Sequence, residues 1–260
     1  MEIQEHMEIE AIGERVGQFR EVLQRTKAEL SRQLSFPWYP YDSMGNFGQL
    51  ERLLSGPNRR LLDLADGRPI ADIGGADGDV AFFLETLGQE VDFVDYPPTN
   101  MNGLRGVKAL KQALGSSIAI HETDLDSQFR LPRSSYGLVI FLGILYHLKN
   151  PYYVLEALAR STRYCLISTR IARFTPDHAT RLADAPVAYL LDCLECNKDS
   201  SNYWIFSEAG LRRILSRTGW QVCDFMTAGD TVDSDPAAAS HDERAYCLVK
   251  STVDPKAARS

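Results

Sequence analysis

The spacing of apolar residues in the first part of the chain predicts helices. Over 16–34 the apolar residues recur every three or four positions with charged residues between them, as on one face of an amphipathic helix. Prolines, glycines and many aromatic residues then interrupt regular structure over 36–48. A second helix is expected over 47–65. We therefore expect residues 1–67 to form a helical cap that precedes the main fold.

From residue 68 onward, short apolar runs alternate with amphipathic stretches. The predicted strands are 69–74, 90–95, 117–124, 136–143, 163–171, 220–227 and 244–250, and the predicted helices are 79–88, 102–115, 151–161 and 206–219. Strands separated by helices pair in parallel through right-handed crossovers. We therefore expect an α/β fold with a doubly wound, mostly parallel sheet of seven strands over 68–251. Such a sheet binds ligands outside the carboxyl ends of its strands.

Residues 172–203 break this alternation after the fifth predicted strand. Loops longer than ~12–15 residues usually have a role, so we interpret this segment as an insertion that covers the site. A helical piece is expected within it, near 185–195. The acidic, alanine-rich segment 229–243 is expected to be an exposed hairpin connection, and 252–260 a frayed tail.

Composition and charge narrow the class of protein. The 260 residues fit one α/β domain with an embellishment. With 28 basic and 35 acidic residues, the formal net charge of −7 argues against broad, non-specific binding to nucleic acid or to an anionic membrane. No apolar stretch approaches the ~20 residues that cross a bilayer, and the start of the chain is acidic where a secretory signal would be basic. We expect a cytoplasmic protein with reduced cysteines and no membrane partner.

Cys193 and Cys196 form a C-x-x-C pair. A structural zinc ion would need two further ligands, and only His178 lies nearby in the sequence. The interpretation favoured for this pair is inert helix thiols, and we predict no metal.

The most informative segment is a predicted strand that runs into a glycine-rich turn and then a helix, over 70–80. Gly74 and Gly78, with the small Gly75 and Ala76 between them, allow a tight turn and a close approach to a ligand. The helix behind such a turn presents free amide groups. A dinucleotide site would have G-x-G-x-x-G, which this turn lacks because Ala76 stands at the third position.

Acidic residues at three strand ends favour a ligand other than a dinucleotide. Asp72 precedes the turn, where a carboxylate repels a pyrophosphate but suits a cationic amino acid. Asp95 closes the second strand, where it can accept both hydroxyls of a ribose, and Asp124 closes the third, near an adenine amino group. Asp92 and Asp126 compete with them for these two roles. The pattern suits S-adenosylmethionine better than NAD.

These motifs resemble the class I S-adenosylmethionine-dependent methyltransferases from about residue 68 to 250, and the segments 142–151 and 203–222 add to the resemblance. It implies that the glycine turn wraps the methionyl part of the cofactor, with S-adenosylhomocysteine as the product. The cofactor-binding residues that it implies are Asp72, Gly74, Gly75, Ala76, Gly78, Asp95, Tyr96, Asp124, Leu125 and Gly143, the last lining the methyl-transfer pocket with Ile144.

A narrower likeness links 143–147, Pro151 and the aromatic segment to the branch of enzymes that form 5-oxyacetate on the wobble uridine of tRNA. A small-molecule methyl acceptor is the main prediction, because the acidic chain offers little surface for RNA. A tRNA acceptor is the first alternative. The second is a non-catalytic nucleotide-binding protein on the same fold.

Two neighbouring residues are candidates for catalysis. His147 is either a general base for an acceptor hydroxyl or amine, or a residue that caps the helix after Pro151 or orients Tyr146. Tyr146 either contacts the acceptor or packs. Methyl transfer often needs no base, because aligning the acceptor supplies much of the rate.

Further residues are candidates for contact with the acceptor. Arg170 and Arg173 follow the fifth strand and bind an anionic group or form a solvated face. The aromatic residues of the cap build a lid or fix the cap to the sheet, and two aromatics at the end of the insertion close the pocket. These residues are Trp38, Tyr39, Tyr41, Tyr203 and Trp204.

Overall fold

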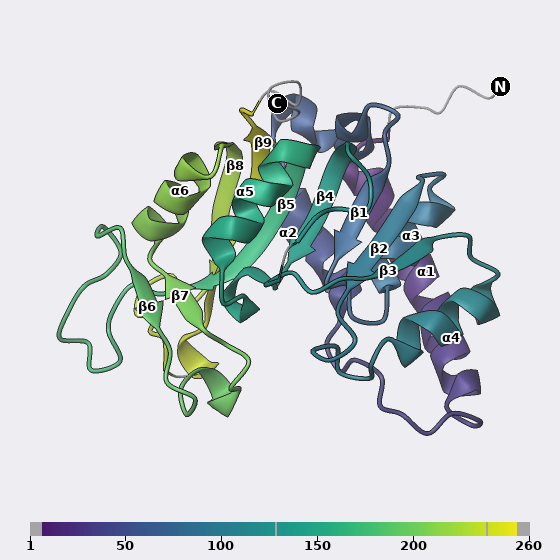
Figure 1. The fold of residues 1–260 in the computed structure, drawn as a ribbon, viewed down its shortest axis with the longest axis horizontal. Coiled ribbons are helices and arrows are strands. Elements are labelled where there is room, and N and C mark those ends of the chain that lie inside the picture. The colour runs from purple at the N-terminus through teal and green to yellow at the C-terminus, as the bar shows by residue number, and fades with distance from the viewer. Residues whose placement is uncertain (1–6, 128, 238, 254–260) are drawn as a thin grey trace. The chain divides into compact units, whose positions relative to one another are not determined.

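The computed structural model describes residues 7–127, 129–237 and 239–253 (Figure 1). The chain divides into two compact units. The first holds the chain up to Asp124 together with Pro132–Ile140, and the second holds Leu125–Leu131 together with the chain from Phe141. The predicted cap therefore groups with the first strands of the main fold. Most of the predicted tail, 254–260, lies outside the described residues.

Two α-helices of the first unit precede its sheet in the sequence. α1 (Ile9–Leu30) begins and ends earlier than predicted. α2 (Asn46–Leu53) is shorter than the predicted helix 47–65. The remainder forms two 3-10 helices, η2 (Gly56–Arg59) and η3 (Leu61–Ala65). Pro57 explains the break, since proline offers no amide hydrogen to continue α2.

The sheet of the first unit has four parallel strands. They are β1 (Ile70–Ile73), β2 (Val91–Asp95), β3 (Ala119–Glu122) and β4 (Tyr136–Leu142), in the order β3-β2-β1-β4. The helices α3 (Asp79–Thr86) and α4 (Arg105–Leu114) are the crossovers between β1 and β2 and between β2 and β3. Ile73 pairs with Val94, and Asp95 pairs with Glu122. The carboxyl ends of β1, β2 and β3 therefore lie at one edge of the sheet.

The second unit is built around antiparallel strands. After α5 (Pro151–Ser161) come β5 (Thr162–Ile171), β6 (Ala188–Leu190), β7 (Trp204–Phe206), α6 (Glu208–Arg217), β8 (Trp220–Gly229) and β9 (Glu243–Ser251). β9 pairs antiparallel with both β5 and β8, and β7 pairs in parallel with the end of β5. The predicted α/β fold with a mostly parallel central sheet is confirmed. The described residues form nine strands where seven were predicted, and the additional strands are β6 and β7.

The expectation of a helix near 185–195 is wrong. Residues Ala188–Leu190 are the strand β6, which pairs antiparallel with β7 through Tyr189 and Ile205. Backbone groups committed to this ladder are not available to a helix.

The segment 229–243 was predicted to be exposed, but part of it is buried. Ser234 and Asp235 are 0% and 3% exposed. The Ser234 carbonyl accepts hydrogen bonds from the backbone N–H groups of Arg173 and Phe174, at 2.9 and 3.0 Å. These bonds compensate for burying polar residues, which composition alone does not reveal. Among the helices within the described residues, none is long and apolar enough to cross a membrane.

Candidate active site

The glycine turn of the first unit joins β1 to α3 in an unusual backbone conformation. Gly74, Ala76 and Gly78 have φ of 66°, 56° and 83°, the left-handed region that favours glycine. A Cβ at Gly78 would lie 2.7 Å from the Val107 side chain, so only glycine fits there. Ala76 holds this conformation with a side chain, a local strain that commonly accompanies function.

Asp72 lies beneath this turn. It is 2% exposed, and a Cβ on Gly75 would collide with its Oδ2 atom. In the part of the chain that the structure describes, Oδ2 has no hydrogen-bond partner. Burial raises the pKa of Asp72 to about 7. An unpartnered buried carboxylate oxygen destabilises the free protein, and such groups are typical of sites that a ligand completes.

Asp95 closes β2 and is held by its neighbours. Its Oδ1 accepts from the Tyr96 backbone N–H at 2.7 Å, and its Oδ2 accepts from the Asn100 side-chain amide at 2.8 Å. The same amide donates to the carbonyl of Ala76 at 3.0 Å, which ties the carboxylate to the glycine turn. Burial raises the pKa of Asp95 to about 6 although these bonds lower it. Asn100 was not among the predicted site residues, because a polar residue after a strand carries no distinguishing signal.

The carboxylate of the competing acid Asp92 is already bound by other side chains of the first unit. Asp92 is 0% exposed, and its carboxylate accepts from Arg133 at 2.6 and 2.9 Å and from the Tyr136 hydroxyl at 2.6 Å. Asp126 accepts from the backbone N–H groups of Lys149 and Asn150 at the start of α5. These partners favour Asp95 and Asp124 for the ribose and adenine roles, which stay predictions.

Asp124 follows the carboxyl end of β3 in the first unit. The backbone N–H of Thr123 donates to the carbonyl of Asp95 at 2.9 Å, so Asp124 follows the last paired position. Leu125 is 9% exposed in the second unit.

The acid within the turn, Asp77, anchors the aromatic segment. Asp77 is 2% exposed and accepts from the Tyr39 backbone N–H and the Asn102 side chain, both at 2.8 Å. The Lys27 ammonium lies 3.4 Å from it. Trp38 donates from Nε1 to the Ser31 hydroxyl at 2.8 Å. The aromatic segment is thus attached to the glycine turn.

Tyr41 is 72% exposed and its ring contacts that of Tyr39 at 5.3 Å between centroids. These contacts support the attachment of the cap. The lid over the site remains a prediction.

His147 lies in the second unit, on the 3-10 helix η4 (Leu145–His147). Its Nδ1 atom is 3.1 Å from both the carbonyl and the hydroxyl oxygen of Ser201. The single hydroxyl hydrogen of Ser201 is donated to Asp199 at 2.6 Å, so Nδ1 faces two acceptors and carries the hydrogen. Nε2 is then left with its lone pair. Burial lowers the pKa of His147, which favours this neutral form.

The alternative of His147 as a helix cap is not what the structure has. The N-cap residue of α5 is Asn150, and the amides before α5 donate to Asp126. Gly143, with φ of 78°, donates its backbone N–H to Ser168 at 2.9 Å. Gly143 thus lies at the bend between β4 and η4.

Tyr146 joins the end of the insertion to η4. Its carbonyl accepts from the Tyr203 backbone N–H at 2.8 Å, and its hydroxyl accepts from Arg244 at 3.4 Å. Trp204 donates from Nε1 to the carbonyl of Lys149 at 3.4 Å. The two aromatic residues at the end of the insertion therefore contact the segment that carries His147. Closing of a pocket by them stays a prediction.

Arg170 and Arg173 each form an ion pair with an acidic residue of the second unit. Arg170 is 2% exposed, with Nε 2.7 Å from Asp242 and Nη1 2.7 Å from the Cys196 sulfur. Arg173 makes two bonds to the buried Glu243, at 2.8 and 2.6 Å. Arg170 therefore lies on no solvated face, and both guanidinium groups have internal partners. Binding of an anionic acceptor by them remains a prediction.

The C-x-x-C pair is not on an α-helix, contrary to the prediction. Cys196 begins the 3-10 helix η5 (Cys196–Lys198) and is buried, whereas Cys193 is exposed. Burial raises the pKa of the Cys196 thiol.

A parallel sheet with a glycine turn after its first strand and a carboxylate at the end of its second is typical of nucleotide-binding α/β folds, among them the class I methyltransferases. Solved methyltransferase structures share the fold of this chain. The N-terminal domain of EvdMO1 with SAH bound has a TM-score of 0.55 at 14% identity over 90% of this chain and 97% of that one. A putative methyltransferase from Bacillus halodurans has a TM-score of 0.55 at 13% identity, over 76% of this chain and 100% of that one. An S-adenosylmethionine-dependent methyltransferase from Clostridium acetobutylicum has a TM-score of 0.50 at 11% identity, over 74% and 89%. No match was found among curated protein sequences.

The family model described as a methyltransferase domain matches residues 47–224. The chain belongs to this methyltransferase family. The predicted class, an S-adenosylmethionine-dependent methyltransferase of class I, is confirmed.

Proposed function

We propose that the chain transfers a methyl group from S-adenosylmethionine to a hydroxyl or amine of a small molecule, with His147 as the base. The observation that carries the cofactor assignment is the pair of carboxylates at the glycine turn, of which Asp72 is buried and Asp95 is half-buried. Asp72 has an unpartnered oxygen beneath Gly75, and Asp95 is oriented by Asn100.

The residues of the first unit fit the proposed cofactor. The carboxylate of Asp72 suits the ammonium of an amino acid, because a cation lowers the pKa of a buried acid and restores its charge. Asp95 presents two oxygens to a pair of ribose hydroxyls, and its present donors hold the carboxylate in place. The left-handed turn at Gly74 and Gly78 lets the backbone approach a ligand closely. When bound, S-adenosylmethionine supplies an electrophilic methyl group on a sulfonium.

In the second unit, His147 is prepared to accept a proton. With Nδ1–H directed at the oxygens of Ser201, Nε2 is the basic atom. A neutral imidazole at neutral pH can take the proton of an acceptor hydroxyl as its oxygen bonds to the methyl carbon. With an amine acceptor, the neutral nitrogen bonds to that carbon first, and the imidazole takes a proton from the positively charged nitrogen that results. Asp199 fixes the hydroxyl of Ser201 and so fixes the orientation of the imidazole.

A small-molecule acceptor is favoured by the ion pairs of four of the five arginines between 160 and 181, the fifth being Arg163, whose guanidinium lies over the Tyr164 ring. Their carboxylate partners are Glu156 for Arg160, Asp242 for Arg170, Glu243 for Arg173 and Asp184 for Arg181. Cations that already have partners contribute less to a phosphate-binding surface, and the chain as a whole is acidic. The tRNA alternative gains no specific support. The cytoplasmic location remains a prediction.

Binding experiments test the cofactor assignment first, and turnover experiments then test the role of His147. Calorimetry on the wild type should give micromolar affinity for S-adenosylhomocysteine and none for NAD. Asp95→Asn should weaken that affinity at least tenfold. Glu122→Gln is the matched control, since Glu122 pairs with Asp95 across the sheet but is half exposed and bound to Lys108. Binding of NAD alone, or equal affinities in the two variants, would contradict the cofactor assignment.

The role of His147 is tested with an acceptor found by screening hydroxyl- and amine-bearing metabolites for release of S-adenosylhomocysteine. His147→Ala should lower kcat at least tenfold while leaving the affinity for S-adenosylhomocysteine unchanged. The wild-type rate should fall as pH falls through the lowered pKa of His147, since the protonated imidazole accepts no proton. A pH profile that is the same in both proteins would refute the base.

A further inference from the structure

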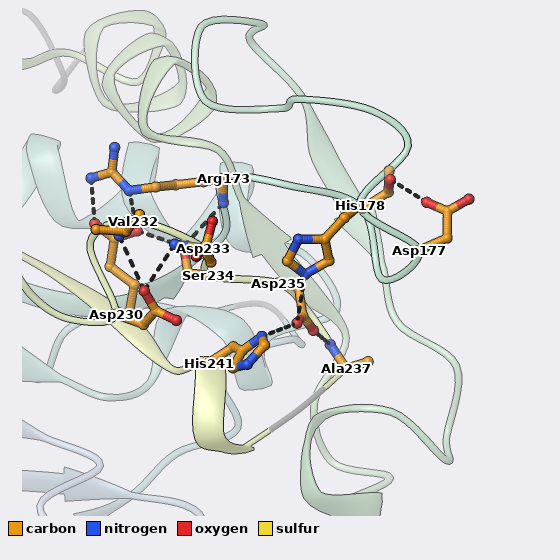
Figure 2. A network of polar contacts seen from close by, with 12 residues as sticks. Arg173, Asp177, His178, Asp230, Val232, Asp233, Ser234, Asp235, Ala237 and His241 are labelled. Atoms are coloured by element: carbon orange, nitrogen blue, oxygen red, sulfur yellow. Dashed lines mark hydrogen bonds and ion pairs between the residues drawn. The ribbon is translucent and has the colours of Figure 1, made fainter.

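Three metal-binding side chains converge in the second unit, away from the residues used above. His178, Asp235 and His241 each offer one donor atom, and the three atoms lie within 4.8 Å of one another. Figure 2 shows the two imidazoles directed at the same carboxylate from different segments. His178 belongs to the insertion, whereas Asp235 and His241 belong to the connection between β8 and β9.

The distances fit the edges of a metal coordination shell. Oδ2 of Asp235 is 3.4 Å from Nε2 of His178 and 2.7 Å from Nδ1 of His241. With metal–ligand bonds of ~2.0–2.2 Å in a tetrahedron, neighbouring ligand atoms lie about 3.4 Å apart. A shift of less than about 1 Å by the His241 ring would therefore widen its distance from Oδ2 from 2.7 Å to the spacing expected of neighbouring ligand atoms.

The surroundings hold the carboxylate and leave the imidazoles accessible. Asp235 is 3% exposed, and its other oxygen, Oδ1, accepts from the Ala237 backbone N–H at 2.7 Å. The side chains of His178 and His241 are each 39% exposed, which gives an ion a path from solvent. The ring of Phe174 stacks on that of His178, with 5.3 Å between centroids and 4° between planes. One ligand is thus fixed while the other two can adjust.

Both segments that carry the ligands are fastened to each other next to the cluster. The backbone N–H groups of Arg173 and Phe174 donate to the carbonyl of Ser234, the residue before Asp235. Within the turn of His178, Asp177 accepts from the Thr175 hydroxyl at 2.6 Å and from the Ala179 backbone N–H at 3.1 Å. These bonds fasten the two segments beside the cluster, and an ion bound there would add a further link between the insertion and the β8–β9 connection.

We propose that His178, Asp235 and His241 bind a divalent first-row transition metal ion. Two imidazoles and one carboxylate suit zinc or iron(II), whereas magnesium prefers six oxygen ligands. Three protein ligands leave at least one coordination position for water or another molecule. The site is independent of the cofactor assignment, because it shares no residue with it.

Calorimetry with the full chain, free of any polyhistidine tag and stripped with EDTA, tests the site. Zinc should bind with a stoichiometry near one and magnesium should not bind. Asp235→Asn keeps the acceptor for Ala237 but removes the anionic ligand, and it should weaken zinc binding at least tenfold, as should His178→Ala. His121→Ala is the matched control, since His121 is a half-exposed histidine beside a buried aspartate in the first unit. Circular dichroism of the metal-free proteins checks that each variant is folded.

Each result either supports or overturns the proposed metal site. Tighter binding of iron(II) than of zinc under anaerobic conditions supports the site with iron as its ion. Cobalt(II) should give visible absorption bands that the Asp235→Asn variant lacks. The proposal is overturned if zinc does not bind, if magnesium binds as well as zinc, or if His121→Ala weakens binding as much as His178→Ala. His178→Ala carries the test if Asp235→Asn does not fold, because His178 lies on an exposed turn.

Discussion

Replacing Asp72 by asparagine should stabilise the free protein while weakening cofactor binding. Burial raises the pKa of Asp72 from 3.8 to about 7, so the ionised form is disfavoured in the folded chain. Each pKa unit corresponds to ~1.36 kcal/mol, and a difference of about 3 units therefore destabilises the folded state by about 4 kcal/mol at pH 8, where Asp72 is ionised both folded and unfolded. The neutral amide of asparagine removes this term. The gain has about 4 kcal/mol as its upper limit, since the amide N–H₂ takes over a position without a partner.

The sign of the pH dependence distinguishes this explanation from a change in packing. Because the folded state binds the proton more tightly than the unfolded state, the stability of the wild type rises as pH falls from about 7 towards about 4. At pH 5 Asp72 is protonated in the folded chain and mostly ionised in the unfolded one. The advantage of Asp72→Asn should then shrink to at most about 2 kcal/mol.

Urea unfolding at pH 5, 6, 7 and 8 measures the effect, and calorimetry with S-adenosylhomocysteine measures binding. Asp92→Asn is the matched control in the same sheet. Burial raises the pKa of Asp92, but the bonds from Arg133 and Tyr136 together lower it below its usual range. Losing those charge-assisted bonds should destabilise the protein by at least about 1 kcal/mol at pH 8.

The two aspartates therefore give opposite signs for the same substitution. At pH 8 the affinity of Asp72→Asn for S-adenosylhomocysteine should fall at least tenfold. The reasoning is refuted if Asp72→Asn is no more stable than the wild type at pH 8, or if its advantage is the same at pH 5 and pH 8.

Two further substitutions test the packing of the turn and of the buried arginine, both by urea unfolding. Gly75→Ala brings a Cβ into collision with the Asp72 carboxylate and to 2.9 Å from the Phe93 ring, so stability should fall by about 1–3 kcal/mol. Gly48→Ala is its control, since nothing lies within 4 Å of a Cβ there, and a loss as large as that of Gly75→Ala would argue against the clash. Arg170→Met removes the buried partner of Asp242, which is 36% exposed and keeps its ion pair with Arg244 at 3.3 Å, so the substitution should destabilise by about 1 kcal/mol or more, less than the loss of a fully buried pair. An unchanged stability would remove the structural role of Arg170 and favour acceptor binding instead.

The strands and the acids at their ends were predictable because each depends on a local pattern. Short strand-like segments of four to seven residues, separated by amphipathic stretches, predict β1 to β4, although β2 and β3 also carry charged residues. The acid that closes β2 falls at the ligand edge by alternation alone. The choice of Asp95 over Asp92 rested on that position. The structure adds the reason, since Arg133, 41 residues further along the chain, already pairs with Asp92.

What was missed depends on contacts between distant segments. His147 gains its tautomer from Ser201, 54 residues away, and nothing in the local sequence of either residue indicates that bond. The strand β6 was mistaken for a helix because a three-residue strand is too short for a period to be recognised, and it exists through its pairing with β7. His178 and Asp235 are 57 residues apart, so spacing rules for metal ligands did not bring them together.

The contrast between Asp72 and Asp92 bears on how this chain serves its ligand. Both carboxylates are almost wholly buried in neighbouring strands, yet one has an arginine and a tyrosine as partners and the other has an oxygen without a hydrogen-bond partner among the described residues. A buried acid retained only for folding would be expected to have such partners, since an unpartnered charge lowers stability. The destabilisation at Asp72 is offset once a cation binds beside it, so binding energy and folding energy are linked at this residue. A cofactor with a cationic amino acid group should therefore raise the stability of the wild type more than that of Asp72→Asn, and the difference should grow as pH rises from 5 to 8.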